Sequence, residues 1–457
     1  MTDAAKTPTA RGAKGVSLLA PDAHTRKRNA AEARFRIYGL VAVGIGLFFL
    51  VALLSSIVMN GIGAFQQTGY RLQIELREDV LDKTGTRDIE NIKKVKTFAY
   101  AQLIRAAMLR EIEKAGIDTP LAQAKVTGFS SDLDPMMSDG ARAHLRDLVL
   151  ADPGLIGQTI ELRLLASSRV DGYLKGRVSR DSIARDKNLD TVHLDLVDAL
   201  RSVGVVNTAF NPAFILGSDA SDARPEQAGM GVAILGSLFM MLVVLVLSLP
   251  IGVASSIYLE EFAPKNRFTD LIEVNISNLA AVPSIVFGIL GLAVFIQFMH
   301  LPQSAPLVGG LVLTLMTLPT IIIATRASLQ SVPPSIRDAA LGVGASKMQA
   351  VFHHVLPLAM PGILTGTIIG LAQALGETAP LLLIGMVGYI ASNYPDGVAS
   401  GFLDPNSAMP AQIFEWAKRA DPAFYERAWG GIIILLVVLL SMNFIAILLR
   451  RRFERRW

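Results

Sequence analysis

The stretch PPSIRDAALGVGASKMQAVFHHVLP, Pro333–Pro357, lies between two long apolar segments and carries the signals of two short helices. Pro334 suits the start of the first helix, and Asp338 in its early turns suits the positive end of the helix dipole. Gly344 interrupts this helix and permits a sharp change of direction. A second short helix is predicted over 345–354. Its apolar side consists of Met348, Val351 and Phe352. Two short helices with exposed apolar surface, hinged at a glycine, are suited to lie in a groove of a partner.

The chain around this stretch has the composition of a membrane protein. Of its 457 residues 51% are hydrophobic and 18% are charged, and a soluble chain of this length normally carries more charge. Six apolar segments are each long enough to cross a hydrocarbon core of about 30 Å. Backbone polar groups have no water partner in lipid, so each segment is predicted as a helix. The segments are Tyr38–Met59, Gly231–Ser255, Leu279–Met299, Pro306–Ala324, Pro361–Val387 and Gly430–Leu449. Kinks are predicted at Pro250, Pro283 and Pro319.

The distribution of Lys and Arg predicts the orientation of these spans. Residues 1–37 form a basic leader, which we expect in the cytoplasm. It is not predicted to be a cleaved signal, because the apolar run after it is about 20 residues long and no small-residue cleavage site follows. This orientation places Pro333–Pro357 and the basic C-terminus in the cytoplasm as well.

Residues 60–227 form a long, charge-rich segment between the first two spans, which this topology places outside the cytoplasm. Long loops translocate largely regardless of their charge. The predicted helices of the segment are Phe98–Lys114 and Ala141–Leu150, and its predicted strands are Tyr70–Arg77 and Thr191–Leu196. We therefore expect an extracytoplasmic α+β domain that serves as a scaffold or docking module.

The fifth apolar segment contains small residues that suggest close helix packing and a charged residue that suggests a translocation path. A ridge of small residues that lets helices approach closely, within this chain or toward a partner, consists of Gly362, Gly366, Gly370 and Ala374. Glu377 follows Gly370 by seven residues, so on one helix it would lie within about 20° of the ridge. A charge at the centre of a span costs about 3 kcal/mol, which makes Glu377, with the adjacent Thr378, a candidate for the path or its gate. Arg326 is its most plausible partner, although anchoring at the cytoplasmic surface explains Arg326 nearly as well.

Several chemistries are not expected. Cys is absent, and the run Gly342–Lys347 lacks the spacing of a phosphate-binding loop. His144 and His193 have no partner ligands at metal-site spacing, and the adjacent His353 and His354 would point about 100° apart on a helix. The net charge of +4 is too small to suggest a nucleic-acid partner. We expect no catalysis, metal or cofactor in this chain.

The opening stretch resembles the coupling loop of ABC-importer permeases. The usual pattern is Glu-Ala-Ala, three residues, Gly, nine residues, Ile, one residue and Leu-Pro. The matching residues here are Asp338, Ala339, Ala340, Gly344, Leu356 and Pro357. Asp338 replaces Glu and keeps the charge, whereas His354 puts a polar ring where Ile is usual. The resemblance implies docking of a partner ATPase on this loop.

Other stretches narrow the resemblance to the phosphate (Pst) importers of bacteria. Ile257–Asn266 and Asn278–Gly288 look like both permeases of that system, and Leu318–Arg326 and Gly376–Pro380 look like its A-type subunit. The similarity covers Gly229 to the C-terminus. It implies a path for inorganic phosphate, a periplasmic phosphate-binding protein, a C-type permease, and an ATPase dimer that holds ATP and Mg. It also implies residence in the bacterial inner membrane.

The resulting prediction is an all-α polytopic membrane protein with six transmembrane helices of ABC-importer permease type and an extracytoplasmic α+β domain between the first two spans. Its parts are a leader at 1–37, a first span at 38–59, the α+β domain at 60–227, and a permease domain at 228–457 with the coupling loop 333–357. A permease for another oxyanion or a phosphonate, an ion-driven transporter, and a membrane-anchored sensor that uses the α+β domain are the alternatives. Both termini are expected in the cytoplasm.

Overall fold

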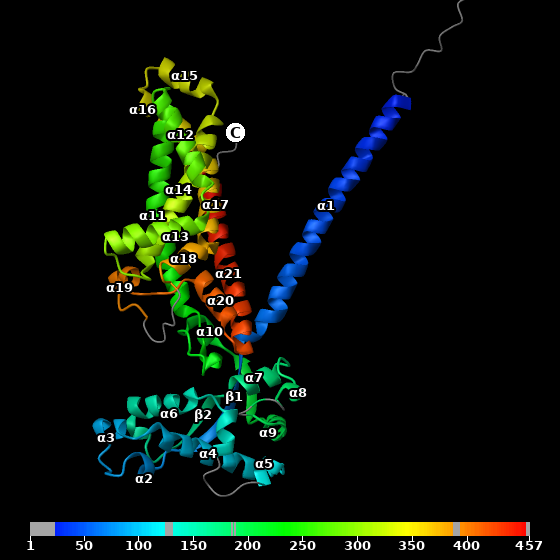
Figure 1. Cartoon of the computed structure of the whole chain (residues 1–457), viewed down its shortest axis with the longest axis vertical. Helices are drawn as coiled ribbons and strands as arrows, with labels where there is room; N and C mark the ends of the chain where they lie inside the picture. The colour runs from blue at the N-terminus through cyan, green and yellow to red at the C-terminus, as the bar shows by residue number, and fades with distance from the viewer. Residues whose placement is uncertain (1–22, 124–130, 184–185, 187–188, 387–393, 454–457) are drawn as a thin grey trace, which may run out of the picture. The chain divides into compact units, whose positions relative to one another are not determined.

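The computed structural model describes residues 23–123, 131–183, 186, 189–386 and 394–453 (Figure 1). The chain divides into two units, residues 1–56 and 57–457. Most of the first unit is helix α1 (Ala23–Gly61), which contains the predicted first span and begins within the predicted leader. Five helices are long and apolar enough to cross a membrane, or six if one bent pair counts as a single span, among the described residues.

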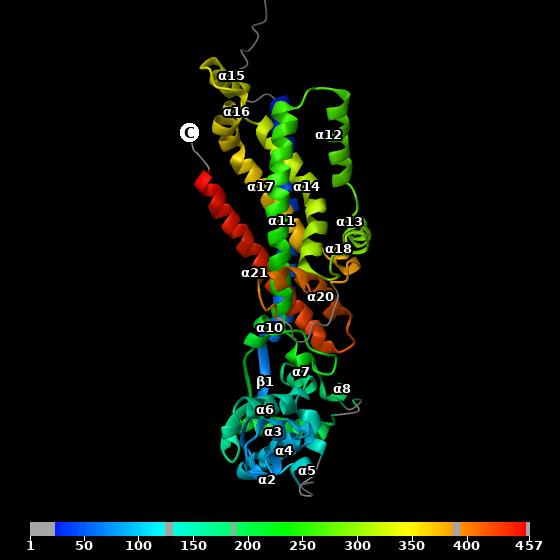
Figure 2. The same ribbon diagram turned by 90° about the vertical axis from the view of Figure 1, so that its left-hand side faces the viewer.

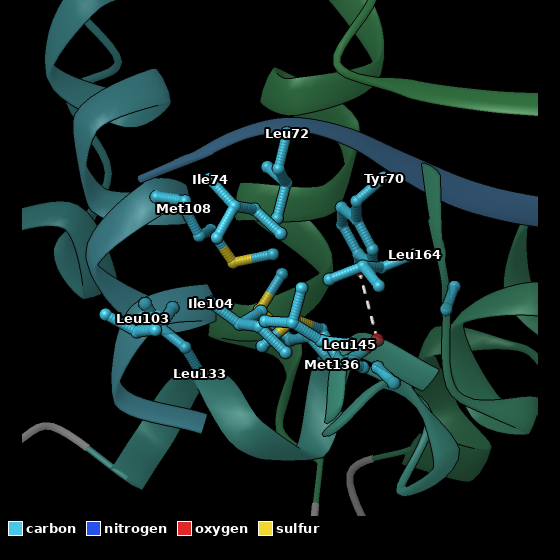
Figure 3. Packing of buried hydrophobic residues seen from close by; sticks show 14 of the residues in the cluster. Tyr70, Leu72, Ile74, Leu103, Ile104, Met108, Leu133, Met136, Leu145 and Leu164 are labelled. Atoms are coloured by element: carbon cyan, nitrogen blue, oxygen red, sulfur yellow. Dashed lines mark hydrogen bonds between the residues drawn. The ribbon is translucent and has the colours of Figure 1, made fainter. Parts of the chain in front are cut away.

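A three-stranded antiparallel sheet organises residues 66–210. Its order is β2 (Thr159–Leu165), β1 (Gln66–Glu75), β3 (Val206–Phe210), and Tyr70 pairs with Leu164 on one side and with Val206 on the other. Alternate side chains of β1 point into a core beneath helices α4 (Thr97–Lys114) and α6 (Gly140–Ala151), as side chains alternate along any strand. Figure 3 shows this core around Tyr70, Leu72 and Ile74.

Shorter elements complete this α+β part. They are η1 (Ile62–Phe65), α2 (Glu78–Leu81), α3 (Ile89–Lys93), α5 (Pro120–Gln123), η2 (Ser131–Met136), η3 (Pro153–Leu155), α7 (Ser168–Leu174), α8 (Arg180–Ile183), α9 (Thr191–Ser202), α10 (Pro212–Leu216) and η4 (Pro225–Gln227).

Sequence patterns located three of the four elements predicted here. The predicted helices are present as α4 and α6, and the strand at 70–77 is present as β1. The strand predicted at Thr191–Leu196 is wrong, because these residues begin helix α9. Asp190 and His193 form a capping box at its start, and Leu194, Val197 and Leu200 are buried at helical spacing.

The remaining helices form a bundle in which α11 (Gly231–Ile257), α14 (Pro306–Gln330) and α17 (Leu356–Gly376) lie side by side (Figures 1 and 2). Pro250 and Pro319 lie inside α11 and α14, which continue past them. The other elements are η5 (Tyr258–Phe262), α12 (Arg267–Ala280), α13 (Ser284–Gly291), η6 (Leu292–Phe298), α15 (Pro334–Gly342), α16 (Lys347–Ala350), η7 (Val351–Val355), α18 (Ala379–Leu383), α19 (Val398–Leu403), α20 (Met409–Lys418) and α21 (Pro422–Phe453).

The predicted span Leu279–Met299 is not one helix. The pair α12 and α13–η6 bends by 100° at the break after Ala280. Pro283 has an extended backbone (ψ 136°) at the start of α13, and a proline also disfavours helix at the residue before it. The predicted kink at Pro283 is therefore present as a full break between two helices.

The predicted span Pro361–Val387 also has different limits. One continuous helix, Lys347–Gly376, includes α16, η7 and α17, so the second short helix predicted at 345–354 is the start of this span. Pro357 lies inside this continuous helix, two residues after the π-helical turn η7, and the helix continues past it. The helix ends at Gly376, because Glu377 has an extended backbone (φ −74°, ψ 133°). Val387 lies outside the described residues.

Buried ion pairs join the α+β part to the last helix of the bundle. Lys175 Nζ lies 2.6 Å from Asp171 Oδ2 and 3.0 Å from Glu426 Oε1, and all three side chains are at most 8% exposed. Arg177 pairs with both carboxylates as well. A Cβ at Gly63 would lie 2.6 Å from Glu426 Oε1, so a larger residue there would displace this carboxylate from its ion pairs. The α+β part is thus fixed to the start of α21 by buried side chains.

A second buried acid lies at the same junction. Glu226 in η4 accepts a hydrogen bond from Ser138 Oγ, and its backbone carbonyl accepts bonds from Gln67 Nε2 (2.8 Å) and Arg427 (3.0 Å). Burial raises the pKa of the Glu226 carboxyl above its usual value. A raised acid pKa in the folded state means that the stability it contributes is lost as the pH rises from the usual pKa through the raised one.

The Glu426 pairs yield a stability prediction. Glu426→Gln leaves the buried Lys175 with one negative partner, and breaking a buried ion pair costs about 3–5 kcal/mol. The purified full-length protein should therefore unfold at a lower temperature in differential scanning fluorimetry. Glu415→Gln is the control, because its pair with Lys418 is partly exposed to solvent (28% and 52%) and contributes about 1 kcal/mol or less. Equal unfolding temperatures for both variants would contradict the role of this junction.

Candidate functional site

Helix α15 ends in a glycine-based turn that reverses the chain. The Gly344 N–H donates to the carbonyl of Leu341 (2.9 Å), and the Ala345 N–H donates to that of Ala340 (3.1 Å). These two bonds define the Schellman arrangement, in which the residue after the helix is left-handed. Gly344 has φ +91°, a conformation that costs other residues about 1–2 kcal/mol. The hinge predicted from the sequence therefore rests on a backbone that favours glycine.

The next helix starts with a capping box that the sequence analysis missed. Ser346 Oγ accepts a bond from the Gln349 N–H (3.2 Å), and Gln349 Oε1 accepts one from the Ser346 N–H (2.8 Å). The pattern Ser-x-x-Gln is a known signal for a helix start. Because both groups are satisfied locally, α16 begins sharply at Lys347 and runs directly into η7 and α17.

The residues predicted for coupling do not all lie on one surface. Asp338, Ala339 and Gly344 are exposed, whereas Ala340 is buried. Leu356 and Pro357 are half-buried within the continuous helix. The apolar side chains exposed on this segment are Leu341 (48%), Val343 (85%), Met348 (61%) and Phe352 (43%).

Val351 does not belong to the exposed apolar side predicted for the second helix. It is 1% exposed and packs with Leu329, Val355 and Ala359 in a small core between α14 and α17. The prediction placed it beside Met348 and Phe352. Residues 345–355 therefore present two different faces, one to the core and one to the outside.

An ion pair that the sequence analysis did not foresee holds α15 to the bundle. Arg337 donates to Glu261 Oε1 from Nη2 (2.7 Å) and from Nε (3.1 Å). Its guanidinium also donates to the carbonyls of Leu329 (2.9 Å) and Val332 (2.8 Å). The Glu261 side chain is 7% exposed. Charge-assisted bonds in a sheltered site are strong, so this group, which we name the anchor, ties α15 to η5 and to the end of α14.

Arg326 is not the partner of Glu377. Its Nη2 lies 2.7 Å from Glu273 Oε1 on α12, and its Nε lies 3.5 Å from Glu260 Oε2 on η5. Gln330 Nε2 also donates to Glu260 (2.9 Å). Arg326 thus links α14 to α12 and to the end of α11, and the adjacent acids Glu260 and Glu261 have separate basic partners.

Glu377 and Thr378 lie between α17 and α18, and both are half-buried. Because α17 ends at Gly376, the geometry that placed Glu377 on the small-residue ridge is wrong. Within the described part of the chain Glu377 forms no ion pair. Glu377 therefore lies at a break between two helices, whereas the sequence analysis placed it in the middle of one continuous span.

The small-residue ridge lies against α14 of the same chain. A Cβ at Gly366 would collide with Ala324, and one at Gly362 would collide with Ser328. A Cβ at Gly370 would lie 3.5 Å from Ile321, and Ala374 is fully buried. The sequence left open whether the ridge packs within this chain or against a partner, and in the structure it packs within this chain.

No group of three or more His, Asp or Glu side chains able to hold a metal occurs among the residues that the structure describes. His193 takes part in the cap of α9. His353 and His354 are both exposed in η7. Helices α15 and α16 thus combine the anchor, a glycine hinge and exposed apolar side chains.

The anchor leads to a prediction for local opening. Glu261→Gln removes the charge that Arg337 binds, and hydrogen bonds to charged groups contribute about 1.5–3 kcal/mol. Amide hydrogen exchange of residues 334–342 should therefore become at least about tenfold faster. Glu260→Gln, which loosens Arg326 and Gln330 instead, is the matched control and should leave those amides nearly unchanged. Unaltered exchange in Glu261→Gln would show that the anchor does not hold α15.

The family described as "Binding-protein-dependent transport system inner membrane component" matches residues 248–457, and "Domain of unknown function (DUF3333)" matches residues 22–184. Over 234 residues the chain is 33% identical to "Phosphate transport system permease protein PstA 1" of Mycobacterium tuberculosis (strain CDC 1551), a match that covers 51% of this chain and 74% of the relative. It is 31% identical over 255 residues to "Phosphate transport system permease protein PstA 2" of Mycobacterium bovis, covering 56% of this chain and 82% of the relative.

Among solved structures, an inward-facing MetNI methionine ABC transporter aligns with 50% of this chain and 95% of its own, at 15% identity and a TM-score of 0.36. By its similarity to these sequence relatives, this chain belongs to the PstA family of phosphate transport system permease proteins.

Proposed function

We propose that this chain is the membrane-spanning subunit of an ATP-driven importer and forms part of the path for inorganic phosphate. The observation that carries the proposal is the α15–α16 segment, an exposed helical hairpin with a fixed hinge and a buried anchor. Its sequence fits the coupling pattern, and the relatives over this half of the chain are phosphate transport permeases.

The hairpin suggests how force from an ATPase reaches the spans. A partner ATPase, which holds ATP and Mg, binds the exposed side chains around Asp338, Leu341 and Val343. Movement of α15 passes through Arg337 to Glu261 at the end of the α11–η5 helix, and α16 continues rigidly into α17. Both routes are short and stiff. The chain itself performs no covalent chemistry and binds no cofactor in this proposal.

We place the α+β part, residues 60–227, outside the cytoplasm, with both termini inside. The buried pairs between Lys175, Asp171 and Glu426 support a scaffold or docking role over a sensor, because a sensor domain would need freedom to move relative to the spans. Its partners in the assembly are a C-type permease and a periplasmic phosphate-binding protein. The assembly lies in the bacterial inner membrane.

Two helix breaks suggest where the path lies. The break before α13 and the break before α18 belong to helices that pack together, since a Cβ at Gly288 would lie 2.7 Å from Pro380 Cα. Irregular backbone at membrane depth is tolerated only inside protein or beside water. Glu377 lies at the second break, and we propose that it serves the gate; normal phosphate uptake by Glu377→Gln would remove it from that role.

A cell-based uptake measurement tests the proposed substrate. Phosphate-starved cells that lack this chain should take up labelled phosphate poorly at low micromolar concentration, and restoring the chain should restore uptake. Sulfate and a phosphonate serve as competitors for the alternative substrates. Competition by sulfate or phosphonate at equal strength would favour another oxyanion. Unchanged phosphate uptake without the chain would remove phosphate from the proposal.

The hinge provides a test of coupling. Gly344→Val places a β-branched side chain in a left-handed conformation at a cost of about 1–2 kcal/mol or more, although no atom lies within 4 Å of the new Cβ. Phosphate uptake should fall severalfold while the subunit stays in the membrane with its ATPase. Gly342→Val is the control, because this glycine is helical and equally open. Equal uptake by the two variants would contradict the coupling assignment.

A further inference from the structure

An apolar groove of about 470 Å³ lies beside the α15–α16 segment. One wall is the end of α11 with η5, and the other is the continuous helix formed by α16, η7 and the start of α17. Its lining contains no charged residue. Large side chains are left in the open along it, with exposed fractions of 57% for Tyr258, 61% for Met348 and 43% for Phe352.

Both walls contain a π-helical turn. Tyr258 and Phe262 belong to η5, and Phe352 belongs to η7. Single π-helical turns are rare and occur frequently at functional sites, because the wider turn displaces side chains from the regular helical positions. Two such turns on opposite walls of one groove suggest that the groove is a binding site for a ligand.

The position of the groove along α11 indicates where it lies relative to the membrane surface. The helix from Gly231 is apolar up to Leu259, and its first acidic residues are Glu260 and Glu261. A run of this length reaches from one headgroup region to the other. The groove, which begins at Pro250, therefore occupies the last apolar turns before the membrane surface. Tyr258, with an apolar ring and a polar tip, is a residue type enriched at that level.

Basic residues lie at the mouth of the groove, and of the acids that share a pocket with Lys347, Glu260 and Glu261 are paired with Arg326 and Arg337, whereas Asp338 is exposed. Lys347 Nζ lies 5.3 Å from the centre of the Phe262 ring, and Lys347 is exposed. Lys265 and Arg267 follow Phe262 closely and are also exposed. The charges are thus at the polar end of an apolar slot. An occupant that complements both has a negatively charged head and a hydrocarbon tail.

We propose that this groove holds an acyl chain of an anionic phospholipid whose phosphate group lies against Lys347. The lipid fills the space between the end of α11 and the α16–η7 wall. Because the same walls lead to the anchor and to the hinge, an occupied groove supports the orientation of α15. The importer would therefore respond to the anionic lipid content of its membrane, independently of which anion it transports.

The test uses the full-length protein in lipid vesicles and a tryptophan placed in the groove. Phe352→Trp provides the probe, and its emission is compared with that of the parent protein, which contains three tryptophans of its own. Dibrominated phosphatidylglycerol and dibrominated phosphatidylcholine quench tryptophan only on contact. A lysine near the surface contributes about 1 kcal/mol of attraction to anionic lipid, so quenching should show an approximately fivefold preference for phosphatidylglycerol.

Two pairs of variants separate the headgroup from the tail. Lys347→Gln should lower the preference for phosphatidylglycerol several-fold. Lys418→Gln should not, although Lys418 also lies over an aromatic ring, at 5.0 Å from the centre of Phe414. Ala254→Phe, which fills the groove from an exposed position, should reduce quenching by both lipids. Leu242→Phe, at an exposed α11 position outside the groove, should not.

Each other result overturns the proposal. Equal quenching by the two lipids would mean general contact with the bilayer. Absence of quenching by either lipid would mean that a protein segment covers the groove. A Lys347→Gln variant that behaves like Lys418→Gln would place the headgroup elsewhere.

Discussion

The ion pair between Arg337 and Glu261 is the interaction on which the exposed hairpin depends. Helix α15 is short, so its own backbone bonds do not hold it in place, and helices of this length are marginal in water. Its one deeply buried side chain, Ala340, contributes little apolar area. Arg337 compensates because one guanidinium binds a sheltered carboxylate together with the carbonyls of Leu329, in the last turn of α14, and Val332, just beyond it. The apolar residues of the hairpin can therefore remain exposed for a partner.

The same principle operates where the α+β part meets the bundle. Lys175 and Arg177 share Glu426 and Asp171 there, while Arg326 joins Glu260 and Glu273 near the anchor. Between these charged groups the helices pack through small side chains, such as Gly366 against Ala324. Ion pairs at helix ends fix the relative orientation of the helices, because they are directional. Small residues permit close approach of the helices but impose no such direction.

Apolar length and glycine placement made much of this fold predictable. Five of the six predicted spans and the hinge at Gly344 follow from them, because the bilayer sets the length and the left-handed backbone sets the residue. The end of α17 was not predictable from apolar length, since Gly376 and Glu377 lie inside one apolar run and only the backbone angles reveal the break. The partners of Arg326 were missed for a related reason. Glu260 and Glu273 are distant in sequence, and pairing across helices requires their relative placement. Helix α9 was missed because the six residues Thr191–Leu196 fit both the alternating pattern of a strand and the repeat of a helix.

Helix η5 connects the mechanical and the lipid-facing features of the chain. Its five residues point in several directions, so Glu261 reaches inward to the anchor while Tyr258 and Phe262 remain partly open to the groove. A π-helical turn widens the angular spread of side chains relative to an ordinary α-turn. Phe262 and Glu261 are adjacent on the backbone of η5, so the groove and the anchor share one helical turn. The anchor and the groove are parts of one element, and this physical continuity is what allows the composition of the membrane to act on the orientation of α15.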